Sequence, residues 1–208
     1  MKEGTTVNFD ERGLIPVIVQ DSTTGEVLML AYADEKALEL TLKKRELYLF
    51  SRSRGKLWHK GESSGNIMKV REARLDCDGD ALLVMVDPAG PACHTGQRSC
   101  FFNILLKGLK GDVTFPSRLW RYLLKRKDAN LEESYTARLI AQGRPRIAQK
   151  IGEEGVEVAI ALTQNDREQI IYEASDLLYH LFVGLISSGV SLEEIWQELE
   201  SRHGKKDI

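Results

Sequence analysis

The sequence is poor in cysteine, has no excess of charge of either sign and contains no long apolar run. Its three cysteines are an odd number, which argues against a framework of disulfide bonds. The formal net charge of −2 over 208 residues gives no electrostatic reason to expect a nucleic acid as partner. Without a run of about 20 apolar residues, we expect no membrane-spanning helix. The N-terminal residues lack the apolar core of a signal peptide, so we predict a cytoplasmic protein.

The two halves of the chain differ in their hydrophobic pattern. The first half reads mostly as strands, at 14–20, 27–32, 46–52, 67–75 and 81–86, with one short helix that Asp34 caps and a hairpin turn near residue 79. The second half repeats apolar residues with the helical period, which predicts helices at 116–127, 135–142, 145–162, 167–188 and 192–202. The sequence therefore predicts an α+β domain of mostly antiparallel strands at 1–110 and an all-α domain at 111–208, joined by the glycine-bearing segment 107–116.

Asp76, Asp78 and Asp80 occupy alternate positions around Cys77. In an extended segment these carboxylates point to one face, and Cys77 points to the other. Carboxylates that lie close together repel one another, and a hard cation such as Mg²⁺ relieves that repulsion. A polar hairpin turn explains the same residues without a metal, and the segment alone favours the turn.

Cys93 and Cys100 bracket a short loop that contains a glycine, and Cys77 offers a third thiolate. Thiolates are preferred zinc ligands, although six intervening residues exceed the usual spacing of two to four. Zinc with three protein ligands keeps one position open, where a water becomes acidic enough to supply hydroxide at neutral pH. His94 adjoins a cysteine and can move the proton. We predict a catalytic zinc site here, against the alternatives of inert thiols and a surface histidine.

The segment 51–66 is rich in groups that bind phosphate. Arginine and lysine supply charge, while serine hydroxyl groups and glycine amides supply hydrogen-bond donors. Trp58 offers a flat face for a base or a sugar. A solvated basic loop is the alternative, and a tryptophan fits it poorly. We predict that the substrate contacts Arg52, Trp58, Lys60, Ser63 and Ser64.

Acidic residues recur one helical turn apart on two of the predicted helices. Glu153, Glu154 and Glu157 belong to one helix, and Glu173 and Asp176 belong to the next. Exposed acidic faces are the usual explanation of such a pattern, but here apolar residues alternate with the carboxylates. Packing the apolar faces together gathers the carboxylates in one region, which is costly unless cations neutralise them. The pattern therefore predicts a site that binds cations.

The motifs of the first half resemble phosphoribosyl-AMP cyclohydrolase of histidine biosynthesis. The resemblance rests on segments 58–66, 76–80 and 93–101 and extends over roughly residues 9–106. It implies hydrolytic opening of the adenine ring between N1 and C6, in a homodimer whose zinc sites draw ligands from both subunits. The implied ligands are Cys77, Cys93 and Cys100 for zinc and Asp76, Asp78 and Asp80 for magnesium.

The second half resembles the phosphoribosyl-ATP pyrophosphohydrolases, which are MazG-like helical bundles, over about residues 115–203. Its acidic residues match the pattern E-E-x-x-E … E-x-x-D of that superfamily throughout. The resemblance implies magnesium on Glu153, Glu154, Glu157, Glu173 and Asp176. It also implies catalysis by Glu154, and phosphate contacts from Arg144 and Lys150.

The two resemblances support each other, because pyrophosphate removal from phosphoribosyl-ATP gives phosphoribosyl-AMP. Together they predict a bifunctional hydrolase for two successive steps of histidine biosynthesis, with Zn²⁺ and Mg²⁺ as cofactors. Two alternatives stay open. One is a zinc-stabilised binding module fused to a helical nucleotide-binding domain, and the other is a pyrophosphatase that removes noncanonical nucleotides.

Overall fold

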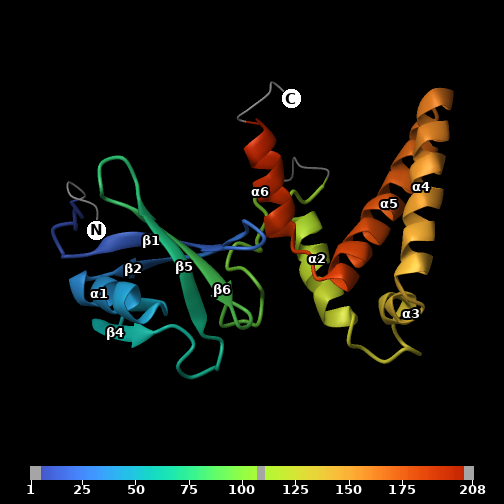
Figure 1. Ribbon diagram of the computed structural model, residues 1–208. Helices are drawn as coiled ribbons and strands as arrows, with labels where there is room; N and C mark the ends of the chain where they lie inside the picture. Colours follow the sequence, from blue (N-terminus) through green and yellow to red (C-terminus); the bar gives the residue numbers. More distant parts are fainter. Residues whose placement is uncertain (1–5, 107–110, 204–208) are drawn as a thin grey trace. The chain divides into compact units, whose positions relative to one another are not determined.

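A computed structural model describes residues 6–106 and 111–203 of the chain (Figure 1). Its contacts divide it into two compact units, Met1–Ser117 and Arg118–Ile208. Helix α2, Phe115–Arg126, begins in the first unit and continues into the second. The boundary expected between residues 110 and 111 adjoins the segment 107–110, which lies outside the described residues.

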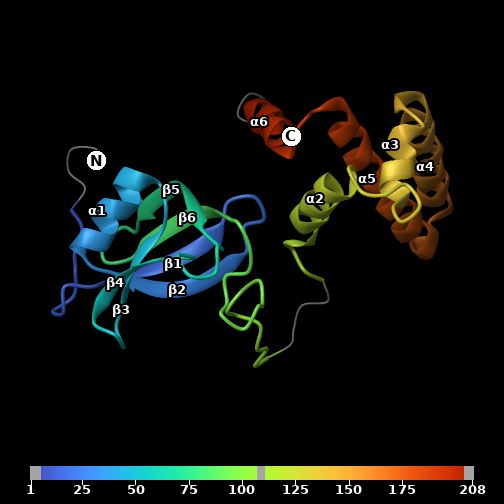
Figure 2. The ribbon, with the colours of Figure 1, turned by 90° about the horizontal axis from the view of Figure 1, so that it is seen from below.

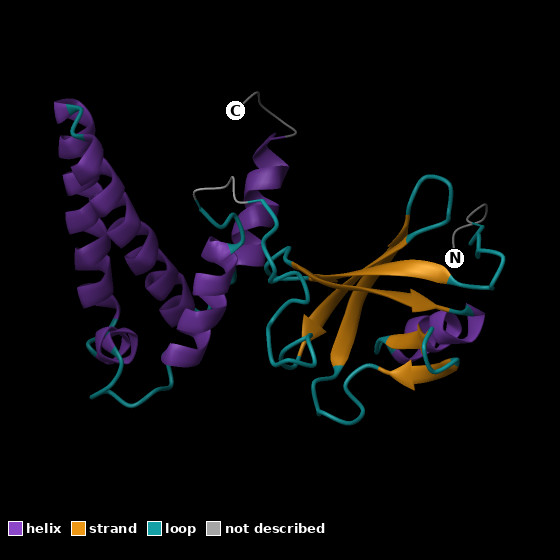
Figure 3. Cartoon of the chain, turned by 180° about the vertical axis from the view of Figure 1, so that it is seen from behind, coloured by secondary structure: helices purple, strands orange, loops and turns teal. Residues whose placement is uncertain are grey.

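The N-terminal unit is built on a β-sheet, drawn in orange in Figure 3. The sheet has six strands in the order β4-β3-β2-β1-β6-β5. The strands are β1 (Ile15–Asp21), β2 (Val27–Ala33), β3 (Tyr48–Ser51), β4 (Lys56–His59), β5 (Met68–Leu75) and β6 (Leu82–Pro88). Neighbouring strands pair antiparallel except β1 and β6, which are parallel. Side chains of β1 alternate between buried and half-buried, as expected for a strand that covers a core.

Helix α1, Glu35–Lys44, lies against the sheet (Figure 2). The predicted cap is confirmed, because Asp34 Oδ1 accepts a hydrogen bond of 2.7 Å from the backbone N–H of Ala37. The core under the helix consists of apolar residues from the strands and from the helix, among them Ile15, Val17, Leu28, Ala37, Leu49, Met68 and Val84. The predicted hairpin between 67–75 and 81–86 is also confirmed, as the antiparallel pair β5–β6.

Strand β4 is absent from the sequence prediction, which treated residues 51–66 as one phosphate-binding segment. In the structure Leu49 pairs with Trp58 and Phe50 with Leu57, and both partners pack against the core. The segment is therefore a hairpin, β3–β4, followed by a loop. Within this segment, the residues outside the two strands are the hairpin turn at 52–55 and the loop at 60–66.

The C-terminal unit is helical, and a sheet unit followed by helices is the predicted order. Its helices are α2, α3 (Tyr135–Ala141), α4 (Arg144–Gln164), α5 (Arg167–Ser188) and α6 (Leu192–His203). The long helices α4 and α5 run side by side (Figure 1). The core of this unit is apolar and includes Trp120, Leu123, Leu139, Ile147, Phe182, Val183, Ile186 and Leu192.

The composition of helix α5 bears on the expectation that no helix spans a membrane. Its 22 residues are long and apolar enough to cross a membrane by length and composition alone. Core helices of soluble proteins share this composition, and α5 packs along α4. Only 22% of its most apolar window is buried, and Ile171, Tyr172 and Leu178 are exposed. Within the described part of the helical unit, α5 therefore keeps apolar side chains exposed.

Candidate active sites

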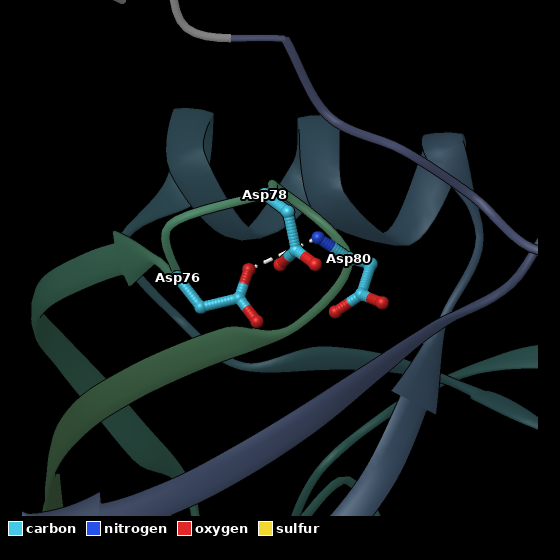
Figure 4. A group of neighbouring side chains, drawn as sticks. All are labelled: Asp76, Asp78 and Asp80. Carbon is cyan, nitrogen blue, oxygen red and sulfur yellow. Dashed lines mark hydrogen bonds between the residues drawn. The ribbon is translucent and has the colours of Figure 1, made fainter.

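Three carboxylates converge at the turn between β5 and β6 (Figure 4). One carboxylate oxygen from each of Asp76, Asp78 and Asp80 lies within 4.8 Å of the other two, and all three residues are exposed. A tight turn causes the convergence: Gly79 adopts a φ of 77°, and Asp76 Oδ1 accepts hydrogen bonds from the backbone N–H groups of Asp80 (3.0 Å) and Ala81 (3.1 Å). The expectation of an extended segment was wrong, since β5 ends at Leu75.

The three aspartates perturb one another electrostatically. The charge of Asp78, followed by a hydrogen bond with Asp76, raises the pKa of Asp80. The backbone N–H of Ala81 holds the pKa of Asp76 below its usual value. Crowded carboxylate oxygens of this kind are the ligands that Mg²⁺ prefers.

The cysteine loop places Cys93 and Cys100 near each other. Cys93 is buried, and Thr95 Oγ1 donates a hydrogen bond of 3.1 Å to its sulfur, which lowers the pKa of the Cys93 thiol. Burial, followed by hydrogen bonding with Cys93, raises the pKa of Cys100. Cys77 is exposed, and within residues 6–106 and 111–203 no group of three close metal-ligating atoms contains a cysteine. The structure therefore brings together two of the three predicted zinc ligands.

Arg98 attaches the cysteine loop to the turn between β1 and β2. Its guanidinium donates a hydrogen bond of 2.6 Å to Asp21, whose side chain is fully buried, and a second to Glu26. Ser99 Oγ donates to the Val27 carbonyl at 2.8 Å, and the Cys100 N–H donates to the Leu28 carbonyl at 2.7 Å. These bonds fix the loop on the edge of β2.

A pocket of about 380 Å³ opens beside this loop. Its walls include five of the side chains that the sequence singled out: Trp58, Lys60, Ser63, Ser64 and His94. Cys93 also lines it, and the His94 Nδ1 atom is 4.0 Å from the Cys93 sulfur. A thiol, an imidazole and several groups predicted to bind phosphate therefore share one cavity.

Other residues of the pocket were missed as binding residues. Arg54, His59 and Asn66 all line it, and they stand within the segment that sequence reasoning had identified. Arg52 lies outside the pocket lining, with its guanidinium carbon 3.8 Å from the centre of the Tyr32 ring. The contact between Arg52 and a substrate stays a prediction.

Lys60 is the most enclosed cation of the pocket, with 8% of its surface exposed. Burial lowers the pKa of its ammonium group, while the charges of Cys100 and Cys93 oppose that change. Its Nζ atom is 5.9 Å from the centre of the Trp58 ring. The pocket therefore combines a flat aromatic face with a buried positive charge.

A second acidic cluster lies between α4 and α5. One carboxylate oxygen from each of Glu154, Glu157 and Glu173 lies within 4.8 Å of the other two. Glu154 is buried, with 5% of its surface exposed. Burial, followed by the charge of Glu157, raises the pKa of Glu173. Among the described residues, neither Glu153 nor Asp176 belongs to this close group.

Two predicted phosphate-binding cations lie near the start of α4. Lys150 Nζ is 3.0 Å from Glu153 Oε2 and 3.6 Å from Glu154 Oε1. The hydrogen bond from Lys150, followed by one from Gln149, lowers the pKa of Glu153. Arg144 donates a hydrogen bond of 3.4 Å to the Ser187 carbonyl on α5. Lys150 is therefore in place to approach the acidic cluster.

A sheet unit whose pocket contains a thiol is followed by a helical unit with a carboxylate cluster, and both kinds of site suit metal-assisted hydrolysis. Residues 29–102 match the family of phosphoribosyl-AMP cyclohydrolases, and residues 117–203 match the family of phosphoribosyl-ATP pyrophosphohydrolases. The chain belongs to the family of bifunctional histidine-biosynthesis proteins that carry both domains. It is a bifunctional hydrolase that catalyses two consecutive steps of that pathway.

The similarity to relatives extends over nearly the whole chain. The "Histidine biosynthesis bifunctional protein HisIE" of Caldanaerobacter subterraneus subsp. tengcongensis is 49% identical over 199 residues, which cover 96% of this chain and 97% of the relative. The protein of the same name from Thermotoga maritima is 51% identical over 192 residues, covering 91% and 98%. The one from Photobacterium profundum is 45% identical over 203 residues, covering 97% and 98%. These matches favour the bifunctional enzyme over both alternatives left open by the sequence.

Proposed function

We propose that each unit catalyses one of the two reactions. The C-terminal unit releases pyrophosphate from phosphoribosyl-ATP at the cluster of Glu154, Glu157 and Glu173. The N-terminal unit then opens the adenine ring of phosphoribosyl-AMP in the pocket beside Cys93. The observation that carries the proposal is the separate cluster of metal-ligating side chains in each unit. The unit for the later reaction would thus precede the unit for the earlier reaction along the chain.

The side chains fit two kinds of metal. Thiolates of Cys77, Cys93 and Cys100 suit Zn²⁺, and carboxylates suit Mg²⁺, both at the aspartates of the turn and at the glutamates of α4 and α5. When bound, such metals make a water more nucleophilic and neutralise phosphate charge. The hydrogen bond from Thr95 lowers the pKa of the Cys93 thiol, which is the direction that favours a metal-binding thiolate.

In the N-terminal unit, the residues of the pocket have distinct roles. Trp58 stacks on the purine, while Lys60, Ser63 and Ser64 bind phosphate oxygens. The phosphoribosyl group on N1 makes the ring cationic and C6 electron-poor, so that water attacks C6 and the N1–C6 bond opens. His94 exchanges the proton, since it lines the pocket beside Cys93.

In the C-terminal unit, which we propose to be a MazG-like bundle, the acidic residues orient a water towards the phosphoanhydride. Glu154 is the central carboxylate because it is buried within the cluster. Glu153 and Asp176 lie on the same two helices, and we propose that they complete the magnesium ligands. Lys150 and Arg144 contact the phosphates.

We further propose a cytoplasmic homodimer that shares its zinc sites. Three free thiols suit a reducing compartment. Apolar side chains directly after Cys100 are exposed: Phe101, Phe102, Ile104, Leu105 and Leu106. Such a surface is typical of an interface, and we propose that a second chain docks there and supplies its Cys77 to the Cys93–Cys100 pair.

The shared site can be tested by mixing Cys77→Ser chains with Cys93→Ser chains. Each variant alone should lack ring-opening activity. Heterodimers regain one complete site, so activity should return on mixing and refolding. Verified heterodimers that stay inactive would show that all three thiols come from one chain.

The assignment of the second activity can be tested with Glu154→Gln. The variant keeps the size of the side chain but removes its charge, so release of pyrophosphate from phosphoribosyl-ATP should fall by at least about 100-fold. Ring opening of supplied phosphoribosyl-AMP should be unchanged. Glu200→Gln, at an exposed position of α6, is the control. Common deoxynucleoside triphosphates, assayed in parallel, should be poor substrates. Loss of ring opening in a folded Glu154→Gln variant would contradict the assignment.

A further inference from the structure

His180 lies buried behind the acidic cluster, although no metal-binding pattern in the sequence includes it. It belongs to α5 and has 5% of its surface exposed. Its Nδ1 atom is 3.6 Å from Glu154 Oε1, which is also buried, and this nitrogen has no hydrogen-bond partner. A buried polar atom without a partner is costly and uncommon. A small movement of Glu154 towards the ring would satisfy it.

The orientation of the His180 ring is fixed from the side of α3. Its Nε2 atom is 3.5 Å from the Tyr135 hydroxyl group, and its ring packs edge-on against Tyr135 and Tyr179, with ring centres 6.4 Å and 5.3 Å apart. Tyr179 is itself held by Thr136, at 2.8 Å between the two hydroxyl oxygens. These contacts direct Nδ1 towards α4 and Glu154.

Glu154 Oε1 lies near two nitrogens, Lys150 Nζ and His180 Nδ1, and their surroundings give them different roles. Lys150 Nζ stands 3.6 Å from this oxygen but is closer, at 3.0 Å, to Glu153. Its side chain is 26% exposed, whereas that of His180 is 7% exposed. A flexible, half-exposed ammonium group screens charge, while a buried ring held by aromatic contacts fixes geometry.

We propose that His180 is a positioning residue of the pyrophosphohydrolase site. Its Nδ1–H donates to Glu154 Oε1, and its Nε2 accepts from the Tyr135 hydroxyl group. This hydrogen bond holds Glu154 in the orientation that brings it together with Glu157 and Glu173. The inference deepens the proposed function of this cluster and rests on it. Partners that orient metal-ligating carboxylates typically contribute about 10–100-fold in metal affinity or activity.

The test compares two amide variants of His180 in the full chain. Asparagine places its amide near the position of Nδ1 and keeps a donor for Glu154, whereas glutamine places its amide nearer to Nε2. We expect His180→Asn to retain most of the kcat/KM for pyrophosphate release and His180→Gln to lose about 10–100-fold. Calorimetric titration with Mg²⁺ alone should show the same order, with a higher Mg²⁺ affinity in His180→Asn than in His180→Gln. Equal loss in both variants, or the reverse order, would overturn the proposal.

A third variant and two controls complete the experiment. His180→Leu fills the space without a donor and should behave like His180→Gln. Ring opening of supplied phosphoribosyl-AMP should be unchanged in every variant, and His203→Asn, at an exposed position of α6, should match the parent chain. Glu154→Gln distinguishes a failure of the proposed site from a failure of the proposed role of His180. If it retains pyrophosphate release, the proposed site is wrong; if it loses release while His180→Leu matches the parent, only the role of His180 is wrong.

Discussion

The attachment of the cysteine loop to the sheet depends on Arg98. Replacing Arg98 by methionine removes the cation but keeps most of the apolar stem of the side chain. It removes the Arg98 guanidinium from the Asp21 carboxylate, whose side chain is fully buried. Glu26 loses its hydrogen bond as well. We expect the N-terminal unit to be destabilised and the Cys93–Cys100 pair to lose its fixed geometry.

The magnitude follows from the surroundings of Asp21. Removing one partner of a buried ion pair costs about 3–5 kcal/mol. Here the Arg98 side chain is 35% exposed, and Asp21 also accepts hydrogen bonds from the N–H groups of Thr23 (2.9 Å) and Thr24 (3.0 Å). We therefore expect a loss of about 2–3 kcal/mol, below the fully buried case. For a domain of this size, the loss corresponds to a lowering of Tm on the order of 10 °C.

Heating the full chain and then assaying both activities measures the effect. In Arg98→Met the ring-opening activity should be lost at a lower temperature, while the release of pyrophosphate follows the parent chain. Arg71→Met is the matched control, since Arg71 pairs with Asp87 on the surface, with 68% of its side chain exposed. That pair should contribute no more than about 1 kcal/mol. Equal lowering in both variants would refute the reasoning.

Two further predictions concern glycines of the pocket loop and the cap of helix α6. Gly61→Ala should lower ring-opening activity at least about tenfold, because Gly61 has a φ of 95° and a Cβ atom there would lie 2.3 Å from the Asn66 carbonyl. At Gly65, which has a φ of 74°, a Cβ atom would meet nothing within 4 Å. Gly65→Ala should therefore lower the free energy of unfolding by only about 1 kcal/mol, as measured by urea unfolding. Ser191→Ala removes the side chain that accepts a hydrogen bond of 3.2 Å from the Glu194 N–H at the start of α6. The free energy of unfolding of the helical unit should fall by about 1 kcal/mol with both activities unchanged, and a larger loss or a loss of activity would contradict a purely local cap.

Much of the secondary structure follows from the sequence because its causes are local. Helix periods, the caps at Asp34 and Ser191 and the turn at Gly79 depend on neighbouring residues, and each is present in the structure. The short strand β4 was missed for the opposite reason. Its polar and aromatic residues acquire strand geometry only by pairing with β3 and packing on the core.

The residue types of both sites were determined by the sequence, but their grouping was decided by the tertiary structure. Helical spacing places Glu153, Glu154 and Glu157 on one helix without saying which of them faces α5. Packing of α4 against α5 buries Glu154 beside Glu173 and leaves Glu153 paired with Lys150. His180 reaches Glu154 across the same interface, from a separation of 26 positions along the chain that no local pattern can connect. Such contacts depend on which faces of two helices meet, and that is fixed by the burial of the whole apolar surface rather than by any one motif.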